Sequence, residues 1–321
     1  MIKTSSMGDV IHTLPALTDA LRAMPGLRFD WVVEEAFAEI PAWHPAVARV
    51  IPVALRRWRR DLWHTLRTAP WRELKASLRE QHYTAAVDAQ GLLKSAWIGL
   101  LQPAPRMGYD CRSAREPLSA LLYQQRFAVP GKQHAVERVR QLLAQALRYP
   151  LPATPPDYGI DTRRLPADAA VGRNLVFLHA TTRPDKHWPE PLWHELCDLA
   201  LGAGYAVRLP WADALARERA ERIADGRAGV EVLPRMGLTE VAGVLNQATA
   251  AVAVDTGLGH LAAALGVPCV SLYGATDPGL IGALGRRQVH LSSAPGAPPF
   301  DGITAQRVWG VLQGQLLAGI G

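Results

Sequence analysis

The sequence predicts an α/β protein built from two doubly wound domains, and three observations support this. Short apolar runs alternate with stretches whose apolar residues recur at helical spacing, as expected for parallel strands joined by crossover helices. The 321 residues are too many for one ordinary domain and enough for two separate cores. A proline-rich stretch interrupts the alternation near the middle. We therefore expect an N-terminal domain over 1–150, a linker over 151–173 and a C-terminal domain over 174–321.

Both halves carry their own predicted elements. Apolar runs predict strands at residues 29–33, 50–53, 85–87, 174–179, 205–210, 230–233, 250–255, 269–273 and 289–291. Helical spacing predicts helices at residues 14–21, 136–147, 189–203, 238–248 and 304–317, the last of which could pack back on the N-terminal domain. Ligands of such sheets bind at the carboxyl ends of the strands, so the loops there are the places to look for chemistry.

Composition and charge indicate a folded protein with an anionic partner. Hydrophobic residues make up 49% of the chain and charged residues 20%, which is typical of globular proteins and excludes wholesale disorder. Lys and Arg number 35 against 29 Asp and Glu, for a net charge of +6 and a pI near 9.5. This balance favours a nucleotide, an acidic lipid surface or a nucleic acid without choosing among them.

Cysteine usage and hydropathy indicate a soluble protein of a reducing compartment. Cys111, Cys197 and Cys269 are far apart and form no C-x-x-C pair, which argues against a disulfide framework and a zinc site. The N-terminal residues lack the apolar core of a signal peptide. No stretch approaches the ~18–20 apolar residues of a membrane span.

A strand-to-helix turn in the second half is a candidate anion site. Residues 253–262 pass from a predicted strand directly into a predicted helix. Gly257 and Gly259 would let the backbone approach a ligand, and the helix start offers unpaired N–H groups and a positive dipole end. The alternative is an ordinary turn whose glycines serve packing, and these residues alone favour neither interpretation.

A second loop favours the anion interpretation. After the strand at 174–179, Thr181 and Thr182 offer hydrogen-bond donors and Lys186 a positive charge. Taken singly, Lys186 is more simply a solvated loop lysine. Because both loops follow strands of one predicted sheet, together they favour a phosphate or pyrophosphate ligand.

The same turn also fits a dinucleotide-binding fingerprint. Gly257-x-Gly259-x-x-Ala262 has the required spacing, and Asp277 follows at the distance of a ribose-binding acid. The fingerprint normally opens its domain, whereas several predicted strands precede it in this chain. A nicotinamide-dependent oxidoreductase is therefore the alternative enzyme class.

Asp9 is the candidate general base of the first half. Gly8 permits a tight turn after the first apolar residues, so Asp9 falls at or near a helix start. There it could be an N-cap, worth roughly 1 kcal/mol, or a general base kept ionised by the helix dipole. The residues alone favour the cap.

A basic stripe follows the second predicted strand. Arg56, Arg57, Arg59 and Arg60 surround Trp58. Arginine with tryptophan can bind phosphates, carboxylates, a lipid interface or a nucleic acid, and the plain alternative is a solvated face. The stripe and the net charge therefore keep a non-enzymatic binder of membranes or nucleic acid open.

Some motifs are absent from the sequence. It has no P-loop and no H-E-x-x-H. It also has no D-x-D pair, which disfavours the metal-dependent nucleotide-sugar transferases that rely on one.

Three strings together resemble the ADP-heptose:lipopolysaccharide heptosyltransferases. They are Lys3-Thr-Ser-Ser-Met-Gly-Asp-Val, His179-Ala-Thr-Thr-Arg-Pro-Asp-Lys-His-Trp-Pro and Val254-Asp-Thr-Gly-Leu-Gly-His-Leu. The resemblance extends over nearly the whole chain. It implies the GT-B architecture, in which two Rossmann-like domains face each other across a cleft. It also implies transfer of L-glycero-D-manno-heptose from ADP-heptose to the inner Kdo of Kdo2-lipid A, with inversion and without a cofactor or an essential metal.

The resemblance assigns roles residue by residue. It makes Asp9 the base and Lys186 the cation that neutralises the departing ADP. It assigns donor binding to Thr181, Thr182, Met236, Asp255, Thr256, Gly257 and His260, and acceptor binding to Ser6, Gly8, Arg56, Arg57, Arg59 and Arg60. The implied location is the cytoplasmic face of the inner membrane, with no nucleic-acid partner.

The chain departs from the family pattern in two places. Only Met1 and Ile2 precede Lys3, whereas relatives carry a few more residues that complete the first strand. The family also places a ribose-binding carboxylate at a position that Ala216 occupies in this sequence. Asp213 or Glu218 could replace it.

Overall fold

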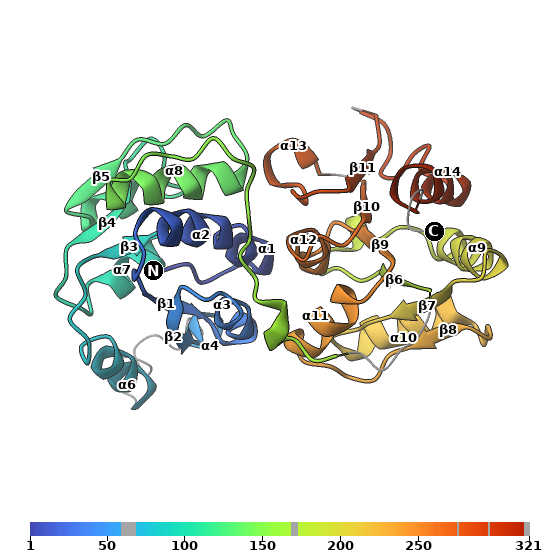
Figure 1. Ribbon diagram of the computed structural model, residues 1–321, viewed down its shortest axis with the longest axis horizontal. Coiled ribbons are helices and arrows are strands. Elements are labelled where there is room, and N and C mark those ends of the chain that lie inside the picture. The colour runs from blue at the N-terminus through green and yellow to red at the C-terminus, as the bar shows by residue number, and fades with distance from the viewer. Residues whose placement is uncertain (59–68, 168–172, 275, 295, 318–321) are drawn as a thin grey trace. The chain divides into compact units, whose positions relative to one another are not determined.

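The computed structural model describes residues 1–58, 69–167, 173–274, 276–294 and 296–317, which form two compact units (Figure 1). The first unit is Met1–Asp161 and the second is Thr162–Gly321. The boundary between them falls inside the proline-rich stretch 151–173. Each unit has its own parallel sheet, so each can be described without reference to the other.

The first unit contains a parallel sheet that the N-terminal residues hold together. β1 (Phe29–Glu34) pairs with β2 (Val47–Val53), and β3 (Ala86–Asp88), β4 (Arg106–Tyr109) and β5 (Gln125–Phe127) pair in that order. Ile2 forms parallel bridges with Val32 of β1 and with Asp88 of β3. The segment around Ile2 therefore lies in the middle of the sheet, and the residues that follow it leave from its carboxyl edge.

Helices surround this sheet, and α2 packs against α8. Over its described residues, the helices of the unit are α1 (Met7–Ile11), α2 (Leu14–Ala23), α3 (Glu39–Ala42), α4 (Leu55–Trp58), α6 (Ala69–Ser77), α7 (Leu93–Gly99) and α8 (Ala135–Leu147), with 3₁₀ turns η1 (Glu35–Phe37) and η2 (Pro117–Leu122). Between α2 and α8, Arg140 Nε lies 2.6 Å from Asp19 Oδ2 with both side chains buried. Each charge of this buried pair needs the other, because an unpaired charge at this depth would be costly.

The second unit contains a six-stranded parallel sheet with the order β11-β10-β9-β6-β7-β8. The strands are β6 (Asn174–Leu178), β7 (Ala206–Leu209), β8 (Val230–Val232), β9 (Ala250–Val254), β10 (Cys269–Tyr273) and β11 (Gln288–Ser292). β6, β9 and β10 are buried along their whole length. Continuous apolar runs suit such strands, because helices cover both faces of a parallel sheet.

Helices cover this second sheet as well, and its core includes Phe177, Trp188, Trp193 and Trp309. The helices are α9 (Glu190–Gly202), α10 (Ala214–Ala224), α11 (Leu238–Asn246), α12 (Gly257–Ala264), α13 (Pro278–Ile281) and α14 (Ala305–Val311), with 3₁₀ turns η3 (Thr162–Arg164) and η4 (Pro184–Lys186). α9 packs on α10 and α14, and α11 packs on α12.

The prediction of an α/β chain with parallel sheets is confirmed in both halves. Two strands of the first unit, β4 and β5, were not predicted, because they are short and mix charged residues with apolar ones. The last predicted helix, 304–317, is an α-helix only as far as Val311, and a π-helical turn (Leu312–Leu317) continues it. Over the described residues, the structure contains no helix that is both long and apolar enough to cross a bilayer.

Candidate active site

The carboxyl ends of β6 and β9 bring two of the predicted loops together. These strands are neighbours, with Leu178 opposite Ala253, so the loops that follow them begin side by side. Lys186 Nζ lies 2.6 Å from Asp255 Oδ2, and Thr181 Oγ1 donates a hydrogen bond to the backbone oxygen of Asp255 (3.1 Å). The Lys186 side chain is only 17% exposed. The interpretation of Lys186 as a solvated loop lysine is therefore wrong.

The helix that follows β9 begins next to this ion pair. Thr256 has an extended backbone and precedes Gly257, the first residue of α12, whose leading N–H groups have no helical acceptor. His260 lies one turn further and is half-buried. At Gly259 the packing interpretation holds, because a Cβ there would lie 3.1 Å from the Cβ of Ala253. Anion binding at Thr256 and Gly257 stays a prediction.

The remaining predicted donor-binding residues also lie beyond strand ends. Thr182 is exposed on the loop after β6, and Met236 is half-buried between β8 and α11. The chain thus places three loops of predicted donor-binding residues at one edge of the second sheet, the edge at which parallel sheets bind ligands.

Two of the candidate ribose acids cap helices. The Asp213 carboxylate accepts a hydrogen bond from the backbone N–H of Ala216 (2.9 Å) at the start of α10, while Glu218 is exposed one turn further. Asp277 accepts from the N–H of Gly279 (2.8 Å) and caps α13. This local role accounts for Asp277 without a dinucleotide, and the choice between Asp213 and Glu218 stays a prediction.

Asp9 lies in the first turn of α1. Ser6 is the N-cap residue, and its backbone N–H donates to Asp9 Oδ2 (2.9 Å). Asp9 is thus the third residue of the helix and closes a capping box with Ser6, while Gly8 is buried beside it. The interpretation of Asp9 as the N-cap itself is wrong by three residues.

Two cations flank the Asp9 carboxylate. Lys3 Nζ lies 3.6 Å from Oδ1 and Arg115 Nη1 lies 3.7 Å from Oδ2. Burial alone would raise the pKa of Asp9, but the charge of Lys3, the Ser6 N–H and the charge of Arg115 outweigh burial and hold this pKa below its usual range. Burial also lowers the pKa of Lys3 despite the nearby Asp9. Asp9 is therefore ionised at neutral pH, as a general base must be.

The structure describes one side chain of the basic stripe. Arg57, on α4, is exposed and forms an ion pair with Glu35 of η1 (Nη2 to Oε2, 3.1 Å). Arg59, Arg60 and the side chain of Arg56 lie outside the described part of the chain. Arg57 is a surface cation held by a surface acid, an arrangement that an anionic ligand could displace at little cost.

Comparisons with known proteins identify the family. A family model described as glycosyltransferase family 9 (heptosyltransferase) matches residues 71–304. The chain belongs to this family. It is 60% identical to lipopolysaccharide heptosyltransferase 1 of Pseudomonas aeruginosa, a match covering 91% of this chain and 83% of the relative. It is 52% identical to lipopolysaccharide heptosyltransferase 1 of Escherichia coli K12, over 90% of this chain and 91% of the relative.

Solved structures agree with this assignment. E. coli heptosyltransferase WaaC with ADP is 50% identical, with a TM-score of 0.90 over 97% of this chain and 98% of that one. The WaaC structure with ADP-2-deoxy-2-fluoro heptose has a TM-score of 0.88 at 47% identity, with the same coverage. The heptosyltransferase thus has the GT-B fold. The predicted resemblance to the lipopolysaccharide heptosyltransferases is confirmed, and the relatives point to heptosyltransferase 1. Glycosyl transfer replaces both the oxidoreductase and the non-enzymatic binder.

Two partners of Asp9 were missed in the sequence. Lys3 lies six residues before Asp9 in the same string, but the sequence does not predict the direction in which its side chain points. Arg115 has no local signal, because it approaches Asp9 only through the fold of the segment that follows β4. The heptosyltransferase therefore surrounds its candidate base with charges that sequence spacing does not predict.

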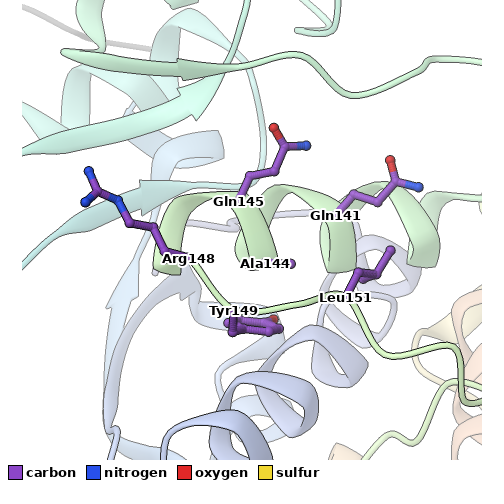
Figure 2. Close-up of a pocket in the computed structure, with 6 residues that line it drawn as sticks. All are labelled: Gln141, Ala144, Gln145, Arg148, Tyr149 and Leu151. Carbon is purple, nitrogen blue, oxygen red and sulfur yellow. The ribbon is translucent and has the colours of Figure 1, made fainter.

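A pocket of about 380 Å³ lies at the carboxyl end of α8, away from these residues in the chain (Figure 2). It is lined by Gln141, Ala144, Gln145, Arg148, Tyr149 and Leu151. Of the predicted site residues that the structure describes, none lines it. In the described part of the chain, no group of three or more His, Cys, Asp or Glu side chains has a metal-binding arrangement.

Proposed function

We propose that this heptosyltransferase moves L-glycero-D-manno-heptose from ADP-heptose to the inner Kdo of Kdo2-lipid A, with inversion. The proposal that ADP-heptose is the donor rests on the 47% identity, over 97% of this chain, to a relative solved with ADP-2-deoxy-2-fluoro heptose. The second unit would bind this donor, residues 151–173 would link the units, and the first unit would bind the acceptor.

Asp9 would be the general base. Its carboxylate would take the proton of the attacking Kdo hydroxyl while the hydroxyl oxygen bonds to the anomeric carbon of the heptose. The bond from that carbon to the phosphate oxygen breaks, and ADP leaves. The low pKa of Asp9 keeps the base ionised but makes it weak. Catalysis then depends strongly on stabilising the leaving group.

Lys186 would provide that stabilisation. Its ammonium pairs with Asp255 at 2.6 Å, so a diphosphate would draw it away from a half-buried carboxylate. The hydroxyls of Thr181 and Thr182 and the N-terminal turn of α12 would contribute further donors. Asp255 and His260 would then contact the heptose, and Met236 the nucleotide.

The acceptor side would use Ser6 and Gly8 beside Asp9, and the stripe Arg56, Arg57, Arg59 and Arg60 against the anionic Kdo and lipid A phosphates. No nucleic acid, cofactor or essential metal is part of this proposal. Because lipid A is held in a bilayer, the enzyme would work on the cytoplasmic face of the inner membrane.

Asp9→Asn tests the function and the base together. Asparagine keeps an oxygen for the Ser6 N–H but cannot take up the hydroxyl proton. We expect wild-type protein to add one heptose mass to Kdo2-lipid A and release ADP, and the variant to lose about 10²–10⁴-fold in kcat with unchanged ADP affinity. The control is Asp157→Asn, which alters a turn carboxylate of the same unit that binds the Gly159 N–H. Equal turnover in Asp9→Asn and wild type would remove Asp9 from the mechanism.

A further inference from the structure

The turn between β3 and α7 holds the segment that leads to Asp9. Gln90, only 2% exposed, accepts hydrogen bonds at Oε1 from the backbone N–H groups of Thr4 (3.0 Å) and Ser5 (3.3 Å). Its Nε2 donates to the backbone oxygen of Ser5 (2.7 Å). One side chain thus satisfies three backbone groups of two consecutive residues, Thr4 and Ser5, which lie 85 or 86 residues away in sequence. The next backbone N–H, that of Ser6, binds Asp9.

A buried carboxylate fixes Gln90 in turn. Asp88 Oδ1 accepts from the backbone N–H groups of Gln90 (2.7 Å) and Gly91 (3.2 Å). Its Oδ2 accepts from Tyr123 Oη (2.6 Å) and lies 2.8 Å from Ser95 Oγ. Both carboxylate oxygens are therefore occupied within the turn and its neighbours. Asp88 is placed to hold the turn in shape, and Gln90 is the group that reaches out of it.

The same turn supports one of the cations beside Asp9. The backbone oxygen of Gly91 accepts from the N–H of Glu116 (3.0 Å), the residue after Arg115. Gly91 has φ +68°, and a Cβ there would lie 3.3 Å from the backbone nitrogen of Arg115. On the other side, Lys3 Nζ donates to the backbone oxygen of Ala89 (3.0 Å). The turn 88–91 thus contacts the backbone or side chain of both cations that flank Asp9.

We propose that Gln90 is a positioning residue that orients the Asp9 carboxylate by fixing the Thr4–Ser6 backbone. The proposal rests on the proposed role of Asp9 as the base. Gln90 is predicted to act only through this backbone, because its amide binds Thr4 and Ser5 and the Ser6 N–H then carries the effect to Asp9 Oδ2. If the Ser6 backbone were no longer held in place, the Asp9 carboxylate would be misoriented. The Ser6 N–H bond, one of the interactions that favour the ionised form of Asp9, would also weaken.

Gln90→Met tests this inference, because methionine has a similar length and forms none of the three hydrogen bonds. We expect kcat to fall by about 10²-fold, the loss typical of a small misplacement of a catalytic group, with the donor KM and the ADP affinity changed less than about twofold. The acid limb of the kcat–pH profile should shift to higher pH. The other titratable groups that face Asp9, Lys3, Arg115 and Tyr109, are unchanged in this variant.

Gln102→Met is the matched control. Gln102 is also a buried glutamine of the first unit, 4% exposed, and its amide also forms three backbone hydrogen bonds, but with Gly99 and Ala104. Both variants should lose similar thermal stability, and only Gln90→Met should change kcat and the pH profile. Equal kcat losses in the two variants, with an unshifted profile, would show a purely structural role and overturn the proposal.

Two further variants keep the inference testable on its own. If Gln90→Met does not fold, Gln90→Glu takes its place, because it retains the oxygen that binds Thr4 and Ser5 but cannot donate to Ser5. This variant should show a smaller loss of kcat and a shift of the acid limb in the same direction. A wild-type kcat and pH profile in this variant would refute the proposal. In an Asp9→Asn background, Gln90→Met should reduce the residual rate no further. An active Asp9→Asn enzyme would defeat the proposed role of Asp9 as the base, on which this inference rests. An inactive one beside a fully active Gln90→Met enzyme would defeat this inference alone.

Discussion

At the scale of single residues, each of the two charged groups proposed for catalysis already has a partner of opposite charge. Asp9 lies between Lys3 and Arg115, and Lys186 pairs with Asp255. Such pairs keep partly buried charges ionised and oriented before a substrate arrives. A bound diphosphate must then compete with Asp255 for the Lys186 ammonium. Lys186 therefore lowers the activation free energy only by the difference between its interaction with the departing diphosphate and its interaction with Asp255.

Lys186→Ala should lower kcat by about 10²–10³-fold, because the departing diphosphate loses the cation proposed to neutralise it. ADP should also bind more weakly, since the variant leaves Asp255 as a half-buried carboxylate without its 2.6 Å partner. Steady-state ADP release and ADP calorimetry measure the two effects. Lys132→Ala, at an exposed lysine of the first unit, controls for loss of a positive charge. Wild-type kcat in Lys186→Ala would contradict the assigned role.

At the scale of elements, the carboxyl end of β6 combines a binding loop with a buried histidine. His179 directly follows the strand and is fully buried. Burial, aided by the charge of Arg219, lowers the pKa of His179 to about 4. The pair Thr181–Asp255 begins two residues later. Protonation of this buried ring by acid would therefore introduce a charge two residues before the Thr181–Asp255 pair of the proposed donor site.

His179 should make the protein less stable as pH falls from about 6.5 to about 4. Its folded pKa lies below the unfolded value of about 6.5, so its stabilising contribution is complete above pH 6.5 and is lost as the unfolded chain alone takes up a proton. The loss would reach about 3 kcal/mol in the free energy of unfolding. Urea unfolding of wild type and His179→Phe at pH 7, 5.5 and 4.5 measures it.

As the pH falls, the free energy of unfolding should therefore decrease more in wild type than in His179→Phe, so the variant gains stability relative to wild type. His82→Phe is the control, at an exposed histidine of the first unit. Parallel pH dependence in all three proteins would exclude His179 as the source of acid sensitivity.

At the scale of the whole molecule, exposed apolar side chains gather on one part of the first unit. Among the described residues nine large apolar side chains are strongly exposed, and five of them lie on or next to α7 and η2, which pack together: Leu93, Trp97, Leu100, Leu118 and Leu121. Trp97 also stacks on Trp71 of α6, with ring centroids 5.2 Å apart. Residues 93–128 carry five cationic and two acidic side chains. Apolar and aromatic side chains within a basic segment suit an anionic lipid surface, as the proposed acceptor requires.

The double variant Leu118→Ser, Leu121→Ser should therefore bind lipid less well. Each leucine can contribute about 1.5–3 kcal/mol when it leaves water, so we expect at least a roughly tenfold loss of binding to phosphatidylglycerol vesicles in flotation. Phosphatidylcholine vesicles should bind weakly in every case. Leu215→Ser is the control, since Leu215 is 76% exposed but lies on α10 of the second unit. If the double variant floats with the vesicles as wild type does, this face is excluded as the lipid-binding surface. If wild type self-associates and the double variant does not, the face binds a second copy of the chain instead.

The sequence predicted the central strands of the second unit because those strands are continuous apolar runs. It did not predict β4, where Arg106 and Gly108 dilute the signal. It placed Thr181, Lys186 and Asp255 on loops of one sheet, and the pairing of β6 with β9 then brought them within hydrogen-bond distance. It gave no indication that Gln90 would contact the segment before Asp9.

The sequence by itself determined the fold class, the family and the chemical types available for the reaction, because apolar periodicity and local strings are properties of neighbouring residues. The tertiary structure decided which of these groups meet. Arg115 comes to Asp9, and Gln90 to Ser5, only after strands far apart in the chain have paired. Burial and charge, which set the protonation of Asp9 and His179, depend on everything packed around them, and no local pattern of residues contains that information.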